Sequence, residues 1–156
     1  MPILYCLVHH HVFTPELTDR KVLGFYESPT KAEAARFEVA KLPGFKDQPD
    51  NFAIEPFRLD DLDEDGPPPE TFFPLEFDRE IIHRDPAGEI LFYEDIEKTL
   101  GVYSTAVKAA EALVAWLREP DYADYPTGFW FGGTTLNTTG WETGYLTAWG
   151  DEETHS

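Results

Sequence analysis

The fold is decided by the stretch Lys21-Val22-Leu23-Gly24-Phe25-Tyr26-Glu27-Ser28-Pro29, whose pattern returns 77 positions later, from Lys98 (98 − 21 = 77). Residues 21–54 align without gaps on residues 98–131, and 11 of the 34 aligned pairs are identical. The identical pairs are Lys21/Lys98, Leu23/Leu100, Gly24/Gly101, Tyr26/Tyr103, Lys31/Lys108, Ala32/Ala109, Ala35/Ala112, Pro43/Pro120, Asp47/Asp124, Pro49/Pro126 and Phe52/Phe129. Unrelated segments match at about one position in 17, so about two identities are expected by chance. The sequence therefore predicts an internal duplication.

Each copy predicts the same order of elements. The aligned segments begin with short apolar and aromatic runs, which are typical of buried strands. The alanine-, leucine- and glutamate-rich runs that follow favour helix, with Ser28 as an N-cap and Ser104 in the corresponding place. The strands are predicted at 3–13, 21–26, 52–59, 75–84, 89–96, 98–103 and 129–136, and the helices at 29–42 and 105–119.

These elements predict an α+β fold made of two ββαβ repeats, with mainly antiparallel sheet and one principal helix in each. The repeats are expected at residues 1–60 and 72–150, separated by an acidic, proline-rich linker at 61–71 and followed by an acidic tail at 151–156. A single ββαβ unit is too small to bury much core. We therefore expect the two repeats to pack together as a pseudo-twofold unit.

Charge is the outlying property of the 156-residue chain, which has 30 acidic and 12 basic residues and a formal net charge of −18. Such a field repels nucleic acids and anionic membranes and attracts basic partners. The single cysteine, Cys6, cannot form an internal disulfide, and the first residues lack the pattern of a signal peptide. We expect a cytoplasmic protein without nucleic-acid or membrane partners.

The motifs resemble a family of small bacterial domains. The resemblance lies in Leu23-Gly24-Phe25-Tyr26-Glu27-Ser28, Lys31-Ala32-Glu33-Ala34 and Leu42-Pro43-Gly44-Phe45, followed by Pro49 and Phe52. The closing motif of that family is similar to Trp141-Glu142-Thr143-Gly144-Tyr145, which occurs only in the second copy. The chain also resembles the small acidic immunity proteins that accompany secreted bacterial toxins, which implies a cognate toxin with a basic surface as its partner.

His9, His10 and His11 raise the possibility of a metal site. Side chains alternate along a strand, so His9 and His11 face the same way and could share an ion. A further ligand would have to come from His83, Glu94 or Asp95. Histidines on a strand are more often structural, and a cysteine in an apolar strand is more often an inert core thiol, so we expect neither a metal nor a nucleophile there.

Two acidic groups are the candidate partner-binding residues. Glu76, Asp78 and Glu80 alternate with Leu75, Phe77 and Arg79, which places the carboxylates on one face of a strand. The second group is the linker cluster of Asp60, Asp61, Asp63, Glu64 and Asp65. Both groups allow two interpretations, a solvated surface or a docking surface for a basic partner.

The aromatic residues Trp141, Tyr145 and Trp149 recur at spacings of four. They could belong to the core or, as in many interfaces, anchor a partner; Trp141 is our candidate for the second role. The sequence contains no phosphate-binding loop, dinucleotide fingerprint, nucleophile elbow or zinc-protease helix. We therefore expect neither enzymatic activity nor a cofactor.

The leading hypothesis is a non-catalytic immunity-type protein that neutralises a toxin by covering it with an acidic surface. One alternative is a small metal-dependent enzyme that uses His9 and His11. Another is an acidic interaction or regulatory module, either monomeric or homodimeric.

Overall fold

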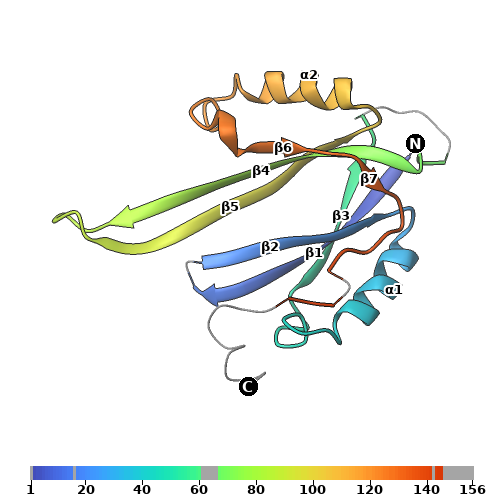
Figure 1. Ribbon diagram of the computed structural model, residues 1–156, viewed down its shortest axis with the longest axis horizontal. Coiled ribbons are helices and arrows are strands. Elements are labelled where there is room, and N and C mark those ends of the chain that lie inside the picture. The colour runs from blue at the N-terminus through green and yellow to red at the C-terminus, as the bar shows by residue number, and fades with distance from the viewer. Residues whose placement is uncertain (1, 16, 61–66, 142, 146–156) are drawn as a thin grey trace.

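The computed structural model describes residues 2–15, 17–60, 67–141 and 143–145, and it shows an α+β fold (Figure 1). The first half of the chain contains β1 (Ile3–Thr14), β2 (Leu17–Tyr26), α1 (Pro29–Val39) and β3 (Phe52–Arg58). The second half contains β4 (Thr71–Arg84), β5 (Ile90–Tyr103), α2 (Ala106–Trp116), a 3-10 turn (Pro126–Gly128), β6 (Phe129–Phe131) and β7 (Thr134–Thr135).

The strands form two antiparallel sheets. Sheet A has the order β2-β1-β3, and sheet B has the order β5-β4-β6 with β7 also paired to β4. The sheets lie against each other between the two helices, with α1 outside sheet A and α2 outside sheet B (Figure 1). The expected α+β class with mainly antiparallel sheet and one principal helix in each half is therefore confirmed.

Two apolar clusters hold the layers together. Between the sheets, Cys6, Phe25, Phe72 and Val102 are buried in one cluster. A second cluster fills the space between sheet A and α1; its buried members are Leu7, Leu23, Tyr26, Ala32, Val39 and Phe45. Alternation along β1 explains the division, because even-numbered residues from Leu4 to Val8 face sheet B while Leu7 faces α1.

Each helix begins at an N-cap residue whose side chain accepts a backbone hydrogen bond, but the N-cap predicted for α2 is wrong. Ser28 caps α1 and accepts a bond from the Lys31 N–H at 3.2 Å. In α2 the cap is Thr105, which accepts from the Lys108 N–H, and the predicted Ser104 instead donates its hydroxyl to Asp60 at 2.6 Å. Both helices end earlier than the prolines at 43 and 120 suggested, because the chain tightens into three-residue turns before each proline.

Three strand predictions also need correction. The separate strands expected at 89–96 and 98–103 are one continuous strand, β5. The strand expected at 129–136 is two short pieces, β6 and β7, separated by Gly132-Gly133. β4 starts at Thr71, within the range predicted to be linker. Of the predicted linker and tail, residues 61–66 and 151–156 lie outside the described residues.

A closing segment, residues 136–141 and 143–145, returns from sheet B to the first half of the chain (Figure 1). It runs along the edge of β2, where the N–H groups of Asn137 and Gly140 donate to the carbonyls of Phe25 and Leu23 at 2.8 and 2.7 Å. The Tyr145 N–H then donates to the Pro43 carbonyl at 3.0 Å. The closing segment therefore completes the first half of the molecule, although it lies at the end of the second half in sequence.

Among the described residues, no helix has both the length and the apolar character needed to cross a membrane.

Candidate functional site

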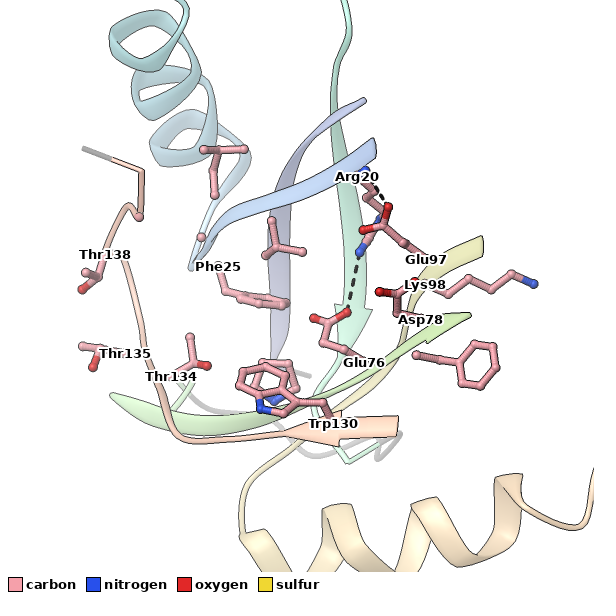
Figure 2. A pocket seen from close by; sticks show the side chains of 16 residues that line it. Arg20, Phe25, Glu76, Asp78, Glu97, Lys98, Trp130, Thr134, Thr135 and Thr138 are labelled. Carbon is pink, nitrogen blue, oxygen red and sulfur yellow. Dashed lines mark hydrogen bonds and ion pairs between the residues drawn. The ribbon is translucent and has the colours of Figure 1, made fainter. Parts of the chain in front are cut away.

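The two sheets diverge on one side of the molecule and leave a cleft of about 470 Å³ (Figure 2). β2 forms one wall, and β4 and β5 contribute Glu76, Asp78 and Glu97. Trp130 of β6 and the threonines at 134 and 135 line the opposite wall, and Thr138 lies beside β2. The cleft is therefore aromatic and hydroxylic at one end and acidic at the other.

Arg20 closes the inner, acidic end of the cleft. Its side chain is only 8% exposed, and its Nη2 lies 2.8 Å from Glu55 Oε1 and 2.9 Å from Thr99 Oγ1. Its Nη1 lies 3.6 Å from Glu76 Oε2, an ion pair drawn in Figure 2. One guanidinium thus serves two carboxylates, so it leaves no excess positive charge in the cleft.

Glu76 is an internal member of this network. Burial raises the pKa of its carboxyl, although the hydrogen bond from Thr99 Oγ1 at 2.7 Å and the charge of Arg20 both act to lower it. Because its Oε2 contacts both Arg20 of β2 and Thr99 of β5, Glu76 joins the sheets together. Glu76 is therefore a structural residue that supports the acidic end of the cleft.

Beyond Glu76 the β4–β5 hairpin carries what we call the carboxylate ladder, formed by Asp78, Glu80, Asp95 and Glu97. Asp78 pairs directly across from Glu97, and Glu80 directly across from Asp95. Like charges in directly opposite positions of an antiparallel pair destabilise the sheet. The ladder therefore lowers the stability of the hairpin, and this cost makes it a candidate binding site.

Glu97 is the most strongly affected carboxylate of the ladder. Burial, reinforced by the negative charges of Asp19, Asp78 and Asp95, raises its pKa to about 7. The Arg20 backbone N–H, at 3.1 Å from Glu97 Oε1, opposes that rise. Burial and neighbouring carboxylates also raise the pKa values of Asp78 and Asp95. A cation entering this site would relieve the repulsion that these shifts express.

The predicted stripe of Glu76, Asp78 and Glu80 thus lies on one face of β4, and the structure adds Asp95 and Glu97 from β5. Asp95 and Glu97 alternate along β5 in the same way, but the sequence indicated Asp95 only as a possible metal ligand and did not single out Glu97. The missing information was the register that brings them opposite the stripe.

Asp60, predicted to bind a partner, has hydrogen-bond partners within the chain. Its side chain is 9% exposed and accepts from the Ser104 N–H at 2.7 Å, from the Ser104 hydroxyl and from Lys108 Nζ at 3.1 Å. Burial would raise the pKa of this carboxyl, but those hydrogen bonds outweigh it and lower the pKa. The other linker candidates, Asp61, Asp63, Glu64 and Asp65, lie outside the described residues.

Trp141 belongs to the closing segment and does not line the cleft. Its indole N–H donates to the Val22 carbonyl at 3.3 Å, and its ring packs edge-on against Tyr145. Lys21 Nζ lies 5.1 Å from the Trp141 ring centroid and 4.2 Å from that of Tyr145. These contacts give Trp141 a role in attaching the closing segment to β2.

The histidines of β1 lie among aromatic side chains. His9 and His11 face the same side, as alternation predicts, and His9 Nε2 is 2.9 Å from the Gln48 carbonyl. Burial lowers the pKa of His9, which favours the neutral ring, and among the described residues its Nδ1 has no hydrogen-bond partner. The Tyr145 hydroxyl lies 2.5 Å from His11 Nδ1.

The proposed additional ligands of a metal site are not beside these histidines. His83 Nε2 pairs with Glu94 Oε1 at 2.9 Å on the distant hairpin. Within the described ranges, no three His, Cys, Asp or Glu side chains are grouped closely enough to hold a metal ion. Cys6 is buried, and burial raises the pKa of its thiol far above the ordinary value.

Comparisons with protein-family models, with curated proteins and with solved structures find no match for this chain. Function is therefore inferred from the geometry of the site itself.

Proposed function

We propose that this protein is a non-catalytic binding protein whose carboxylate ladder docks onto the basic surface of a partner protein. The carrying observation is the pairing of Asp78 with Glu97 and of Glu80 with Asp95, which gathers four carboxylates on one face of one hairpin. Cationic side chains of a partner would neutralise repulsion that the free protein tolerates. The net charge of −18 would add long-range attraction and raise the association rate.

The class of partner follows from the sequence resemblance to immunity proteins. On that basis the protein binds a cognate bacterial toxin in the cytoplasm and neutralises it by covering its active site. Steric cover suits a protein that offers a broad acidic surface on a rigid two-sheet base.

The proposal includes an internal duplication. It is supported by the 11 identities between residues 21–54 and 98–131 and by the matching strand orders β2-β1-β3 and β5-β4-β6. On this view one copy kept a closed outer surface while the other acquired the acidic hairpin, and a pseudo-twofold axis relates the two.

The test is calorimetric titration of the protein with the product of the gene adjacent to its own, at low and at physiological salt. The decisive variant is D78N/E80Q/D95N/E97Q, which removes four charges but keeps side-chain size. We expect at least a tenfold weaker affinity, equivalent to about 1.4 kcal/mol. The same variant should unfold at higher urea concentration than the wild type, because the opposed like charges are gone.

The matched control is D47N/D50N/E111Q/E119Q, which removes four exposed carboxylates elsewhere on the molecule. Equal weakening by both variants would mean that net charge acts without the ladder. A wild-type protein that fails to bind the adjacent product at either salt concentration would overturn the proposal.

A further inference from the structure

The outer half of the β4–β5 hairpin exposes apolar side chains on one face of its two strands. Figure 1 shows the hairpin projecting beyond the other strands. Along the ladder face, the pair that follows Glu80 and Asp95 is Ile82 and Tyr93, which are directly opposed and 43% and 41% exposed. Leu91, near the turn, is 61% exposed. The face therefore changes from acidic to apolar over one step along the hairpin.

Large apolar side chains that are exposed next to one another, as Ile82 and Tyr93 are, often mark a binding surface. A sheet face is normally covered by a helix or by another sheet. The outer faces of both sheets already have their helices, α1 and α2 (Figure 1). The ladder face of the hairpin turns toward β2, and the Arg20 N–H of that strand bonds to Glu97 Oε1, so sheet A covers the inner end of this face. Further out, Asp78, Glu80, Ile82 and Tyr93 are exposed, and no helix among the described residues covers them.

The charge of the face selects its occupant. A second copy of this chain would bring the same four carboxylates and the same net charge of −18 against it, which Coulomb repulsion opposes. A segment that combines basic and apolar side chains satisfies both parts of the face. Spacing narrows this further, because successive pairs on one face of a strand lie about 7 Å apart.

Residues four apart on a helix are separated by about 6 Å along its axis, close to that spacing. We propose that the hairpin face binds an amphipathic helix of the partner, with two basic side chains one turn apart and an apolar side chain one turn further on. One basic group meets Asp78, at the edge of the part that β2 covers, the other meets the Glu80–Asp95 pair, and the apolar group packs on Ile82 and Tyr93. This inference rests on the proposed function and specifies the partner's binding element.

The probe is an alanine-based helical peptide with two arginines one turn apart and leucines at the next turn. Its control is a peptide of the same composition in which the arginines and leucines are interchanged along the helix. Binding is followed by calorimetry at low and at physiological salt. We expect the first peptide to bind at least tenfold more tightly than its control.

The variant that isolates the apolar part is I82T/Y93T, which leaves every charge in place and keeps strand-forming residues. We expect it to weaken binding of the arginine–leucine peptide by about tenfold or more, since buried aromatic and aliphatic anchors dominate such interfaces. The matched control is V107A/V114A, which removes two exposed apolar side chains from α2 and should leave binding unchanged.

Three outcomes would overturn the inference. One is equal affinity of wild type and I82T/Y93T for the peptide, and another is no preference between the two peptides. The third is a concentration-dependent dimer that I82T/Y93T abolishes, which would assign the face to a second copy. If the adjacent gene product binds in a ladder-dependent way but is insensitive to I82T/Y93T, the proposed function stands and this inference alone fails.

Discussion

Both halves of the molecule contain two long strands, a helix and a further strand in that order, yet their loops after the helix are buried to different extents. In the first half, Phe45 of this loop is fully buried and contacts His9, Phe52 and Tyr145. In the second half, the aligned Tyr122 is half-buried and contacts Phe77, Trp116 and Phe129. The difference arises because the closing segment covers only the first half.

This contrast suggests a division of labour. The first half, with its additional cover, provides most of the buried cluster around Leu7 and Phe45. The second half exposes apolar residues on α2 and on the hairpin, and it carries the carboxylate ladder. A surface with opposed like charges can persist in one half because the stability comes from the other.

The largest effect is expected from substitutions at two aligned positions, Phe45→Ala and Tyr122→Ala. Loss of a fully buried phenylalanine costs about 3–5 kcal/mol of unfolding free energy. The half-buried Tyr122 should lose about 1–2 kcal/mol, because less apolar surface returns to water. Urea unfolding at neutral pH measures both, and equal losses would contradict the proposed difference between the halves.

Much of the secondary structure could be predicted because local patterns specify it. Ser28 caps a helix through a bond within its own first turn, and the alternation in β1 places His9 and His11 together. The Asp60 contact could not be predicted in this way, because its partner Ser104 lies 44 residues away in sequence (104 − 60 = 44). Packing across the sheets decides such contacts.

The ladder illustrates why the site was only half predicted. Arg84 pairs with Ile90 next to the turn. If the pairing continued from there without a register shift, Asp78 would lie opposite Ile96. The register shift between His83 and Arg84 moves the pairing by one residue and brings Glu97 opposite Asp78. A one-residue shift exchanges the faces of a strand, so the charge pattern depends on a bulge that the sequence does not announce.

A second test compares Gly44→Ala with Asp121→Ala, again at aligned positions. Gly44 has φ +84°, and a Cβ there would lie 2.6 Å from Tyr145 Cε1. The backbone strain and this clash should lower the unfolding free energy by about 2 kcal/mol or more. Asp121 is exposed, and its replacement should change stability by less than about 0.5 kcal/mol.

Urea unfolding of the two variants decides the matter. A Gly44→Ala loss no larger than that of Asp121→Ala would show that Tyr145 does not hold the first half closed.

A third test uses pH to compare the ladder with the rest of the surface. In the folded protein the pKa of Glu97 is raised from 4.5 to about 7, so between these values the folded state retains a proton that the unfolded chain releases. The contribution of Glu97 to stability therefore falls as pH rises from 4.5 to 7, and its loss is complete above 7. Glu97→Gln should flatten this dependence and exceed wild type at pH 8 by about 1 kcal/mol.

Urea unfolding between pH 4.5 and 8 measures the effect, with Glu119→Gln on the exposed surface beyond α2 as the matched control. The glutamine keeps an oxygen that can accept from the Arg20 N–H, so this backbone contact is preserved. A wild-type pH dependence that persists in Glu97→Gln would contradict a raised pKa at this residue.

The smallest expected effect concerns the aligned lysines, Lys21 and Lys98. The Lys21 side chain is 11% exposed, contacts Asp19, and lies over the rings of Trp141 and Tyr145 in the closing segment. The aligned residue of the second half, Lys98, is exposed. Methionine keeps most of the apolar stem, so Lys21→Met removes chiefly the cation and should lower unfolding free energy by about 0.5–1 kcal/mol.

Lys98→Met should be neutral within about 0.5 kcal/mol, because an exposed side chain away from such contacts contributes little. Tryptophan fluorescence during urea unfolding measures both variants. Trp141 reports directly on the closing segment, so Lys21→Met should also shift the emission of the folded protein, whereas Lys98→Met should not. If the two variants behave alike, the closing segment is attached to β2 through its backbone hydrogen bonds, and the cation between its rings adds nothing measurable.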